Sequence, residues 1–201
     1  NLLSRLLDAE DLDHHPVSIE GETRETINIQ EKKTGRQFRF VMPGPELSEE
    51  EWRECIDAVT RMEPSGAFVV ASGSLPPGVP GDFYATLARA VKEADGRLIL
   101  DAPGEEMDAA LEEGVFLIKP NRREFRHLAS REIDSTGDHQ EAAEEIVREG
   151  KAEIVVVSLG AAGAVGATGS GSFRYHSPPV PLESKVGAGD SMVAGIVYGL
   201  S

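Results

Sequence analysis

Short apolar runs alternate with amphipathic segments along most of this 201-residue chain. Unbroken apolar runs are typical of strands buried on both faces, and apolar residues at three- and four-residue spacing indicate helices that pack on them. This alternation predicts a three-layer α/β/α fold around a mostly parallel sheet, in which ligands bind beyond the carboxyl ends of the strands. The expected strands are 67–71, 97–101, 115–119 and 154–158, and the expected helices are 48–62, 81–94, 105–113, 122–129 and 138–149.

The N-terminal part of the chain follows a different pattern. Residues 1–10 place leucines on one face of a short helix. Residues 26–30 and 37–41 alternate apolar and polar positions, and the six polar residues between them look like a hairpin connection. We interpret this pair as a small appended sheet or lid. We therefore expect a single domain over residues 1–201, with residues 17–43 contributing the β-lid.

Composition excludes several classes of protein. The net charge of −15 argues against a nucleic-acid partner, because such binding needs a concentrated basic surface. No apolar run approaches membrane-spanning length and the start lacks a signal peptide, so we expect no membrane partner and a cytoplasmic location. Cys55 is the single cysteine and cannot form an internal disulfide, so we expect a buried, inert thiol. An acidic enzyme that binds phosphates must place positive charge locally, and the chain has only six lysines.

The most informative motif lies near the end of the chain, at 186–191, where Val-Gly-Ala-Gly-Asp-Ser precedes a small-residue helix. Such a helix start exposes unpaired backbone N–H groups and the positive end of the helix dipole, so it attracts anions. A carboxylate at Asp190, among those donors, suits phosphoryl transfer to a hydroxyl. The alternative is an ordinary helix cap, since Asp often caps helices.

Polar loops also follow four consecutive predicted strands. Taken singly, each has an unremarkable interpretation as a loop, a cap or a strand-end charge, but together they favour a binding site at one edge of the sheet. A P-loop motif is absent, and no dinucleotide-binding glycine fingerprint follows any of these strands. The loops are Ser-Gly-Ser-Leu-Pro-Pro-Gly at 72–78, Asp101, Lys-Pro-Asn-Arg-Arg-Glu at 119–124 and Ser-Leu-Gly-Ala-Ala-Gly at 158–163.

The motifs at 72–78, 119–124, 158–164 and 186–191, in this order and spacing, resemble the ribokinase-like sugar kinases of the phosphofructokinase-B branch. The stretch 38–44 and the residues around Asp190 are most similar to the minor-type bacterial 6-phosphofructokinases. The resemblance covers the whole chain. It implies a ribokinase-like fold, an ATP-dependent carbohydrate kinase, and the phosphorylation of fructose 6-phosphate to fructose 1,6-bisphosphate.

The resemblance also implies residue roles. Asp190 resembles the base that deprotonates the sugar hydroxyl, and Gly187, Ala188 and Gly189 the donors of the anion hole. Asn121 and Glu124 resemble the pair that orders Mg²⁺, largely through water, around the ATP phosphates. The other implied ATP-binding residues are Lys119, Ser158, Gly160 and Gly163, and the implied substrate-binding residues are Arg24 and Ser74.

Partners and alternatives follow from the same resemblance. The implied partners are a sugar phosphate and ATP, with Mg²⁺ as the metal, and the lid strands imply a homodimer. A 1-phosphofructokinase or a tagatose-6-phosphate kinase would share nearly every motif. From other classes, a non-catalytic nucleotide-binding fragment and a structural α/β domain unconnected with ATP remain open.

The sequence departs from the family pattern at several places. Thr26 stands where the family has Asn, Lys185 where it has Thr, and 102–104 replace a hydroxyl-rich turn. The family extends further at both ends. We therefore expect that the sheet lacks strands, that nothing after Asp190 covers the apolar side of the last helix, and that these 201 residues alone bind nucleotide poorly and do not turn over.

Overall fold

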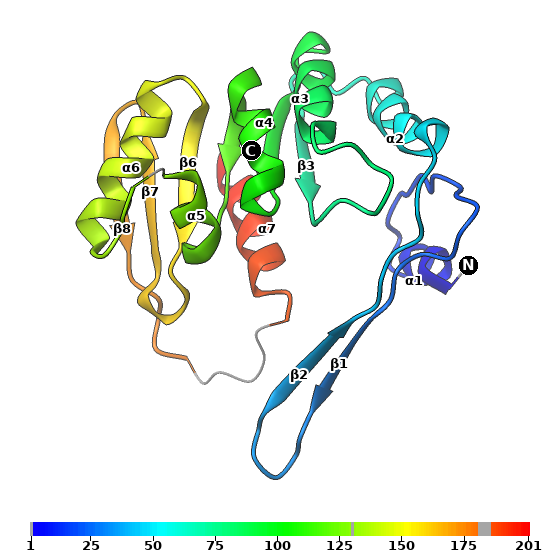
Figure 1. Ribbon diagram of the computed structural model, residues 1–201, viewed down its shortest axis with the longest axis horizontal. Coiled ribbons are helices and arrows are strands. Elements are labelled where there is room, and N and C mark those ends of the chain that lie inside the picture. Colours follow the sequence, from blue (N-terminus) through cyan, green and yellow to red (C-terminus); the bar gives the residue numbers. More distant parts are fainter. Residues whose placement is uncertain (1, 130, 181–185) are drawn as a thin grey trace. The chain divides into compact units, whose positions relative to one another are not determined.

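The computed structural model describes residues 2–129, 131–180 and 186–201. The chain divides into two compact units, Asn1–Met62 with Leu75–Pro80, and Glu63–Ser74 with Gly81–Ser201 (Figure 1). The first unit contains α1 (Leu2–Ala9), β1 (Thr26–Gln30), β2 (Gln37–Val41) and α2 (Glu49–Arg61). The second contains β3 (Phe68–Ser72), α3 (Phe83–Glu93), β4 (Arg97–Asp101), α4 (Gly104–Glu113), β5 (Val115–Ile118), α5 (Arg122–Leu128), α6 (Thr136–Arg148), β6 (Ala152–Ser158), the 3₁₀ turn η1 (Gly160–Ala162), β7 (Ala164–Thr168), β8 (Gly171–Tyr175) and α7 (Ala188–Leu200).

The first unit is built around the predicted hairpin. β1 and β2 pair in antiparallel register from Thr26 opposite Val41 to Gln30 opposite Gln37, and every residue of both strands is exposed. The α2 helix begins with a reciprocal capping box between Ser48 and Glu51, as the sequence predicts. Backbone and side-chain hydrogen bonds to the Glu51 carboxylate lower its pKa. The role of residues 17–43 as a lid stays a prediction.

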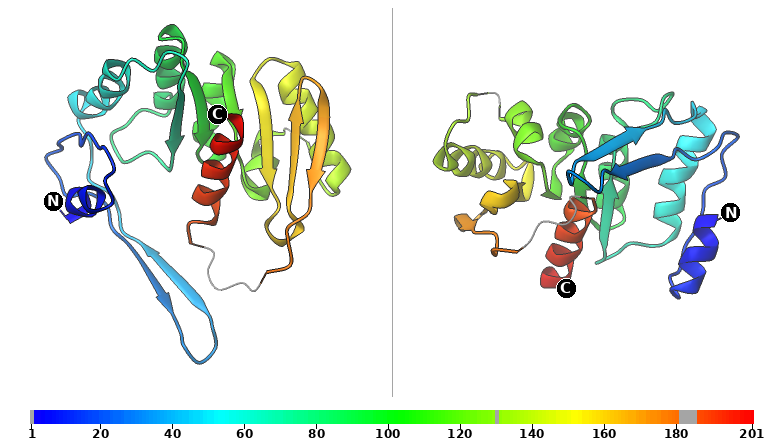
Figure 2. Two further views of the ribbon diagram at one scale, coloured as in Figure 1. Left: turned by 180° about the vertical axis from the view of Figure 1, so that it is seen from behind. Right: turned by 90° about the horizontal axis from the view of Figure 1, so that it is seen from below.

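The second unit contains a six-stranded sheet in the order β3-β4-β5-β6-β7-β8. β3 to β6 run parallel, and β7 and β8 are antiparallel additions at one side. Because successive parallel crossovers in one direction are right-handed, the connecting helices α3 to α6 fall on the same face. α7 covers the other face (Figure 2). The predicted three-layer, mostly parallel architecture is confirmed.

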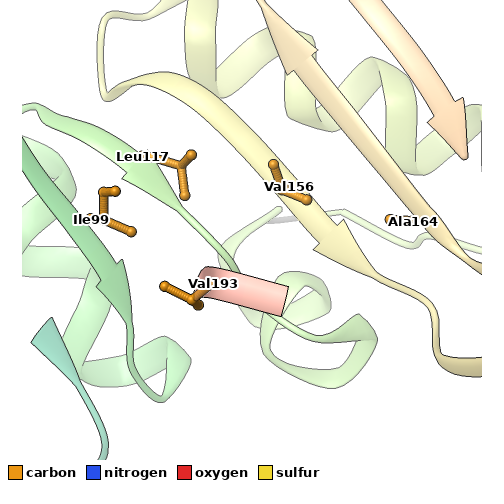
Figure 3. Packing of buried hydrophobic residues seen from close by; sticks show 5 residues of the cluster. All are labelled: Ile99, Leu117, Val156, Ala164 and Val193. Atoms are coloured by element: carbon orange, nitrogen blue, oxygen red, sulfur yellow. The ribbon is translucent and has the colours of Figure 1, made fainter. Parts of the chain in front are cut away.

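The core lies on both faces of the central strands. Ile99, Leu117 and Val156 point to one face and are buried together with Val193 of α7 (Figure 3). Their neighbours Leu98, Leu100, Ile118, Val155 and Val157 are buried on the opposite face. Side chains alternate across a strand, so burial on both faces explains why these strands are unbroken apolar runs.

The apolar side of α7 packs against the sheet. Val193 is buried, and Met192, Ile196 and Val197 pack half-buried against the same cluster. This cover comes from the sheet. That nothing after Asp190 covers these side chains stays a prediction.

Three sequence expectations about the elements were wrong. The strand at 67–71 is not buried: β3 is an edge strand, and Val70 is 45% exposed. The helix expected to begin at Asp138 begins at Thr136, capped by Ser135, with Asp138 completing the capping box. β7 and β8 were not expected at all, because β7 has small residues and a central glycine that are atypical of a strand.

Cys55 is half-buried on α2, and burial raises the pKa of its thiol, in line with the expected low reactivity. Within the described residues, no helix combines the length and the apolar character needed to cross a bilayer.

Candidate active site

The polar residues at the strand ends meet at one edge of the sheet. β3, β4, β5 and β6 are consecutive and parallel, so their carboxyl ends share that edge. Ser72 pairs with Asp101, and Pro120 accepts a hydrogen bond from the Ser158 N–H at 3.0 Å. The structure therefore brings residues 72–74, 101, 119–124 and 158–163 of the second unit to the same edge of the sheet.

A buried ion pair lies at the centre of this edge. The Lys119 ammonium is 3.1 Å from Asp101 Oδ1, and Lys119 is only 3% exposed. The Lys119 backbone N–H continues the ladder by donating to Leu100. An ammonium is costly to bury unless a counter-charge is near, and Asp101 supplies that charge. Asp101 ends a predicted strand, but we had not counted it among the site residues.

The start of α7 lies against this pair. A Cβ placed on Gly189 would be 3.7 Å from Lys119 Nζ and 3.8 Å from Asp101 Oδ2. Gly187 caps the helix with a positive φ of 76° and has no side chain to satisfy the first-turn N–H groups. Asp190 lies exposed in that first turn. The motif at 186–191 thus combines backbone donors, a helix dipole, a nearby cation and a carboxylate.

Asn121 and Glu124 cap α5 reciprocally. Asn121 Oδ1 accepts from the N–H groups of Arg123 and Glu124 at 2.9 and 3.1 Å, and Glu124 Oε2 accepts from the Asn121 N–H at 2.8 Å. Asn121 Oδ1 is therefore already used twice, whereas Glu124 has a second oxygen, Oε1, outside the capping box. Such a pair fits Mg²⁺ held through its waters rather than by direct coordination from Asn121. No cluster of three or more acidic, His or Cys metal ligands occurs among the described residues.

The predicted nucleotide loop follows β6. Asn121 and Ser158 form a parallel bridge that joins this loop to the start of α5. Gly160 and Gly163 both have positive φ, at 63° and 93°; Gly160 begins the 3₁₀ turn η1 and Gly163 follows its last residue. The loop therefore has the left-handed backbone that glycine permits, as the sequence motif suggests.

The predicted substrate residues lie in different units. Ser74 ends a segment of the second unit and is exposed. Arg24 belongs to the first unit, where its stem lies beside Gly44 and Thr26 opens β1. Lys185, one of the departures from the family pattern, lies outside the described residues.

An α/β sheet with its polar loops at the carboxyl ends and a helix N-terminus beside a buried lysine defines a class of phosphate-handling α/β proteins. The chain belongs to the pfkB family of carbohydrate kinases, whose model matches residues 1–201. This confirms the resemblance to the phosphofructokinase-B branch and the ribokinase-like fold.

The relatives narrow this assignment. The chain is 42% identical over 201 residues to the ATP-dependent 6-phosphofructokinase isozyme 2 of Mycobacterium tuberculosis, covering 100% of this chain and 59% of that protein. It is 32% identical to the 1-phosphofructokinase of Bacillus subtilis, covering 99% of this chain and 64% of the relative. The crystal structure of phosphofructokinase-2 from Escherichia coli in complex with fructose-6-phosphate matches with a TM-score of 0.92 and 40% identity, over 99% of this chain and 65% of that one. The chain thus spans about three fifths of the length of these proteins.

Two residues of the second unit to which the sequence analysis gives no role in the site belong with it. Asp101 holds Lys119, and Tyr84 donates a hydrogen bond to the loop after β3. A carboxylate at the carboxyl end of a strand was a visible signal for Asp101. No sequence pattern marks Tyr84, which lies in the apolar face of a helix.

Proposed function

We propose that the full-length protein transfers the γ-phosphoryl group of ATP to a hydroxyl of a sugar phosphate, with fructose 6-phosphate as the acceptor and fructose 1,6-bisphosphate as the product. The observation that carries this proposal is the contact of the Gly189 position with the Lys119–Asp101 pair. It places the first turn of α7, which carries the candidate base and its backbone donors, beside a buried cation. The 42% identity to a 6-phosphofructokinase isozyme 2 supports the choice of acceptor.

Each group would act on a different atom of the reaction. Asp190 takes the proton of the acceptor hydroxyl, whose oxygen forms a bond to the γ-phosphorus while the bond to the bridging oxygen of ADP breaks. The N–H groups of Gly187, Ala188 and Gly189 stabilise the negative charge on the transferred group. Lys119, held by Asp101, adds a fixed positive charge beside them. An acidic protein needs such a local cation to attract a polyanion.

The residues after β5 and β6 serve ATP in this proposal. Glu124 and Asn121 would hold Mg²⁺ through its waters, and the ion would neutralise charge on the ATP phosphates. The positive-φ glycines of the β6 loop let the backbone approach the nucleotide closely. Ser158, Gly160 and Gly163 form that part of the site.

We further propose that residues 17–43 form a lid that joins two subunits. The support is the unusual exposure of large apolar side chains on both hairpin strands, including Ile27, Ile29, Phe38 and Phe40. A crystal structure of phosphofructokinase-2 from Escherichia coli is described as a tetrameric inhibited form. A full-length protein that sediments only as a monomer would contradict this proposal. The expected cytoplasmic location stays a prediction.

A panel of acceptors tests the reaction. The full-length protein is assayed for ADP release from Mg-ATP with fructose 6-phosphate, fructose 1-phosphate or tagatose 6-phosphate, and without an acceptor as the control. We expect fructose 6-phosphate to give the highest kcat/KM, by about tenfold or more. A preference for fructose 1-phosphate would instead support the 1-phosphofructokinase alternative, which the Bacillus subtilis relative favours. No acceptor-dependent release with any of the three would refute a sugar-phosphate kinase.

The same assay tests the role of Arg24 in binding the phosphate of the acceptor. Arg24→Ala should raise KM for the sugar phosphate by roughly 10- to 100-fold, because a charge-assisted hydrogen bond is lost, and leave KM for ATP nearly unchanged. Arg53→Ala is the control, since Arg53 lies in an exposed ion pair on α2 of the same unit. An equal rise of both KM values would move Arg24 out of the acceptor site.

A further inference from the structure

Tyr84 connects α3 to the loop that carries Ser74. Tyr84 is the second residue of α3 and is 5% exposed. Its hydroxyl donates a hydrogen bond of 2.7 Å to the carbonyl oxygen of Gly73. That carbonyl belongs to the peptide group between Gly73 and Ser74, and because a peptide group is planar, fixing its oxygen fixes the direction of the Ser74 N–H.

The Gly73 peptide groups are held from both sides. The Gly73 N–H donates to the carbonyl of Asp101 at 3.0 Å, and its carbonyl accepts from Tyr84. Gly73 has a φ of 114°, and no described residue lies within 4 Å of the position that a Cβ would take there. Hydrogen bonds, and not side-chain packing on Gly73, therefore hold this turn. The hydrogen bond from Tyr84 connects the turn to α3.

The hydroxyl of Tyr84 keeps the proton that it donates in this hydrogen bond. Burial, together with the negative charges of Glu106 and Asp101, raises the pKa of Tyr84 to about 12. A raised pKa favours the neutral phenol, so the hydroxyl keeps its proton at neutral pH. The same Asp101 pairs with Lys119 beside the start of α7. One chain of contacts thus connects Tyr84, Gly73 and the proposed phosphate site.

We propose that Tyr84 is a positioning residue for the sugar-phosphate side of the site. It holds the Gly73–Ser74 peptide in the orientation that the acceptor needs, without touching the acceptor itself. This inference rests on the proposed function and on the substrate-binding role that the family resemblance implies for Ser74. It assigns to α3 a part in acceptor binding that the strand-end motifs alone do not indicate.

Tyr84→Phe in the full-length protein tests this inference, because phenylalanine keeps the buried ring and removes only the donor. We expect KM for fructose 6-phosphate to rise about 3- to 10-fold, as for the loss of one neutral hydrogen bond, with KM for ATP unchanged within about twofold. Tyr198→Phe is the matched control, since Tyr198 is 86% exposed on α7. A purely structural role would lower the melting temperature and change both KM values together. That result, or an unchanged KM for fructose 6-phosphate, would overturn the inference.

A double-mutant cycle with Ser74→Ala separates positioning from an independent effect. If Tyr84 acts through the Gly73–Ser74 peptide, the double variant should raise KM by clearly less than the product of the two single effects. Multiplying effects would overturn the inference. The wild-type protein must first show acceptor-dependent turnover. Absence of that turnover is a failure of the proposed function, whereas normal turnover with an insensitive Tyr84→Phe variant is a failure of this inference alone.

Discussion

At the scale of single residues, Gly163 is the position in the proposed nucleotide loop with least tolerance for a side chain. It has a φ of 93°, and a Cβ there would lie 1.9 Å from the carbonyl oxygen of Tyr175. Backbone, unlike the end of a flexible side chain, cannot move aside without disturbing the β7–β8 pair. The glycine is therefore needed for the fold of the loop as well as for any approach of a nucleotide.

Gly163→Ala should accordingly lower the free energy of unfolding by roughly 2 kcal/mol or more, because the strained φ and the collision with backbone add. Gly169→Ala is the matched control: no described residue lies within 4 Å of its Cβ position, and its φ is not in the left-handed region. Denaturant unfolding of the two variants measures the difference. Equal stabilities would show that the loop relaxes around the added methyl group.

The sequence predicts those candidate site residues whose type is required by the local backbone. Gly187 and Gly160 can be predicted because their positive φ requires glycine. Asn121 and Glu124 can be predicted because their spacing is that of a helix start. The same spacing also fits the capping role that they have here, so the sequence cannot separate capping from metal binding. The Lys119–Asp101 ion pair connects the ends of two neighbouring strands. It can be predicted only once the pairing of those strands is known.

At the scale of elements, α7 links the core to the proposed chemistry. Its first turn carries Asp190, and one turn later Val193 packs on Ile99 and Leu117 of the sheet. The position of the proposed anion hole is therefore set by apolar packing on the next turn of the same helix. Catalysis that depends on position is sensitive to shifts of about 1 Å.

Val193→Ala should lower both stability and kcat. Removing two buried methyl-sized groups should cost about 1–3 kcal/mol, and a shift of α7 should reduce kcat severalfold with little change in the KM values. Val180→Ala, at a position that is 71% exposed and lies outside the 186–191 motif, is the control. Unfolding curves and steady-state kinetics on the full-length variants give both numbers. A destabilised variant with normal kcat would contradict the link between packing and chemistry.

The ends of a strand or helix could be predicted where burial decides its pattern of apolar and polar residues. β1, β2 and β4 have the expected ends, because alternation or an unbroken apolar run bounds each of them. β7 escaped notice since Gly166 interrupts it, and the reason is tertiary: a Cβ on Gly166 would lie 2.2 Å from the ring of Phe173 on β8. The neighbouring strand β8 thus requires a glycine at position 166. The sequence of β7 alone does not show this requirement.

At the scale of the whole molecule, a strongly acidic chain contains a small cationic centre. The chain carries a net charge of −15, yet its buried lysine lies beside a helix N-terminus. The chain spans 59% of the Mycobacterium tuberculosis relative, and the proposed activity is that of the full-length protein. That these 201 residues alone bind nucleotide poorly and do not turn over stays a prediction.

The central claim is that Asp190 at the start of α7 is the base for phosphoryl transfer. The most direct measurement is steady-state kinetics of Asp190→Asn in the full-length protein, with Mg-ATP and fructose 6-phosphate. The account predicts that kcat falls by about 10²–10⁴-fold, with KM for ATP and the melting temperature nearly unchanged. Asp82→Asn, an exposed carboxylate that makes no capping hydrogen bond in the described part of α3, should behave as wild type. An Asp190→Asn variant that keeps most of its kcat would contradict the claim.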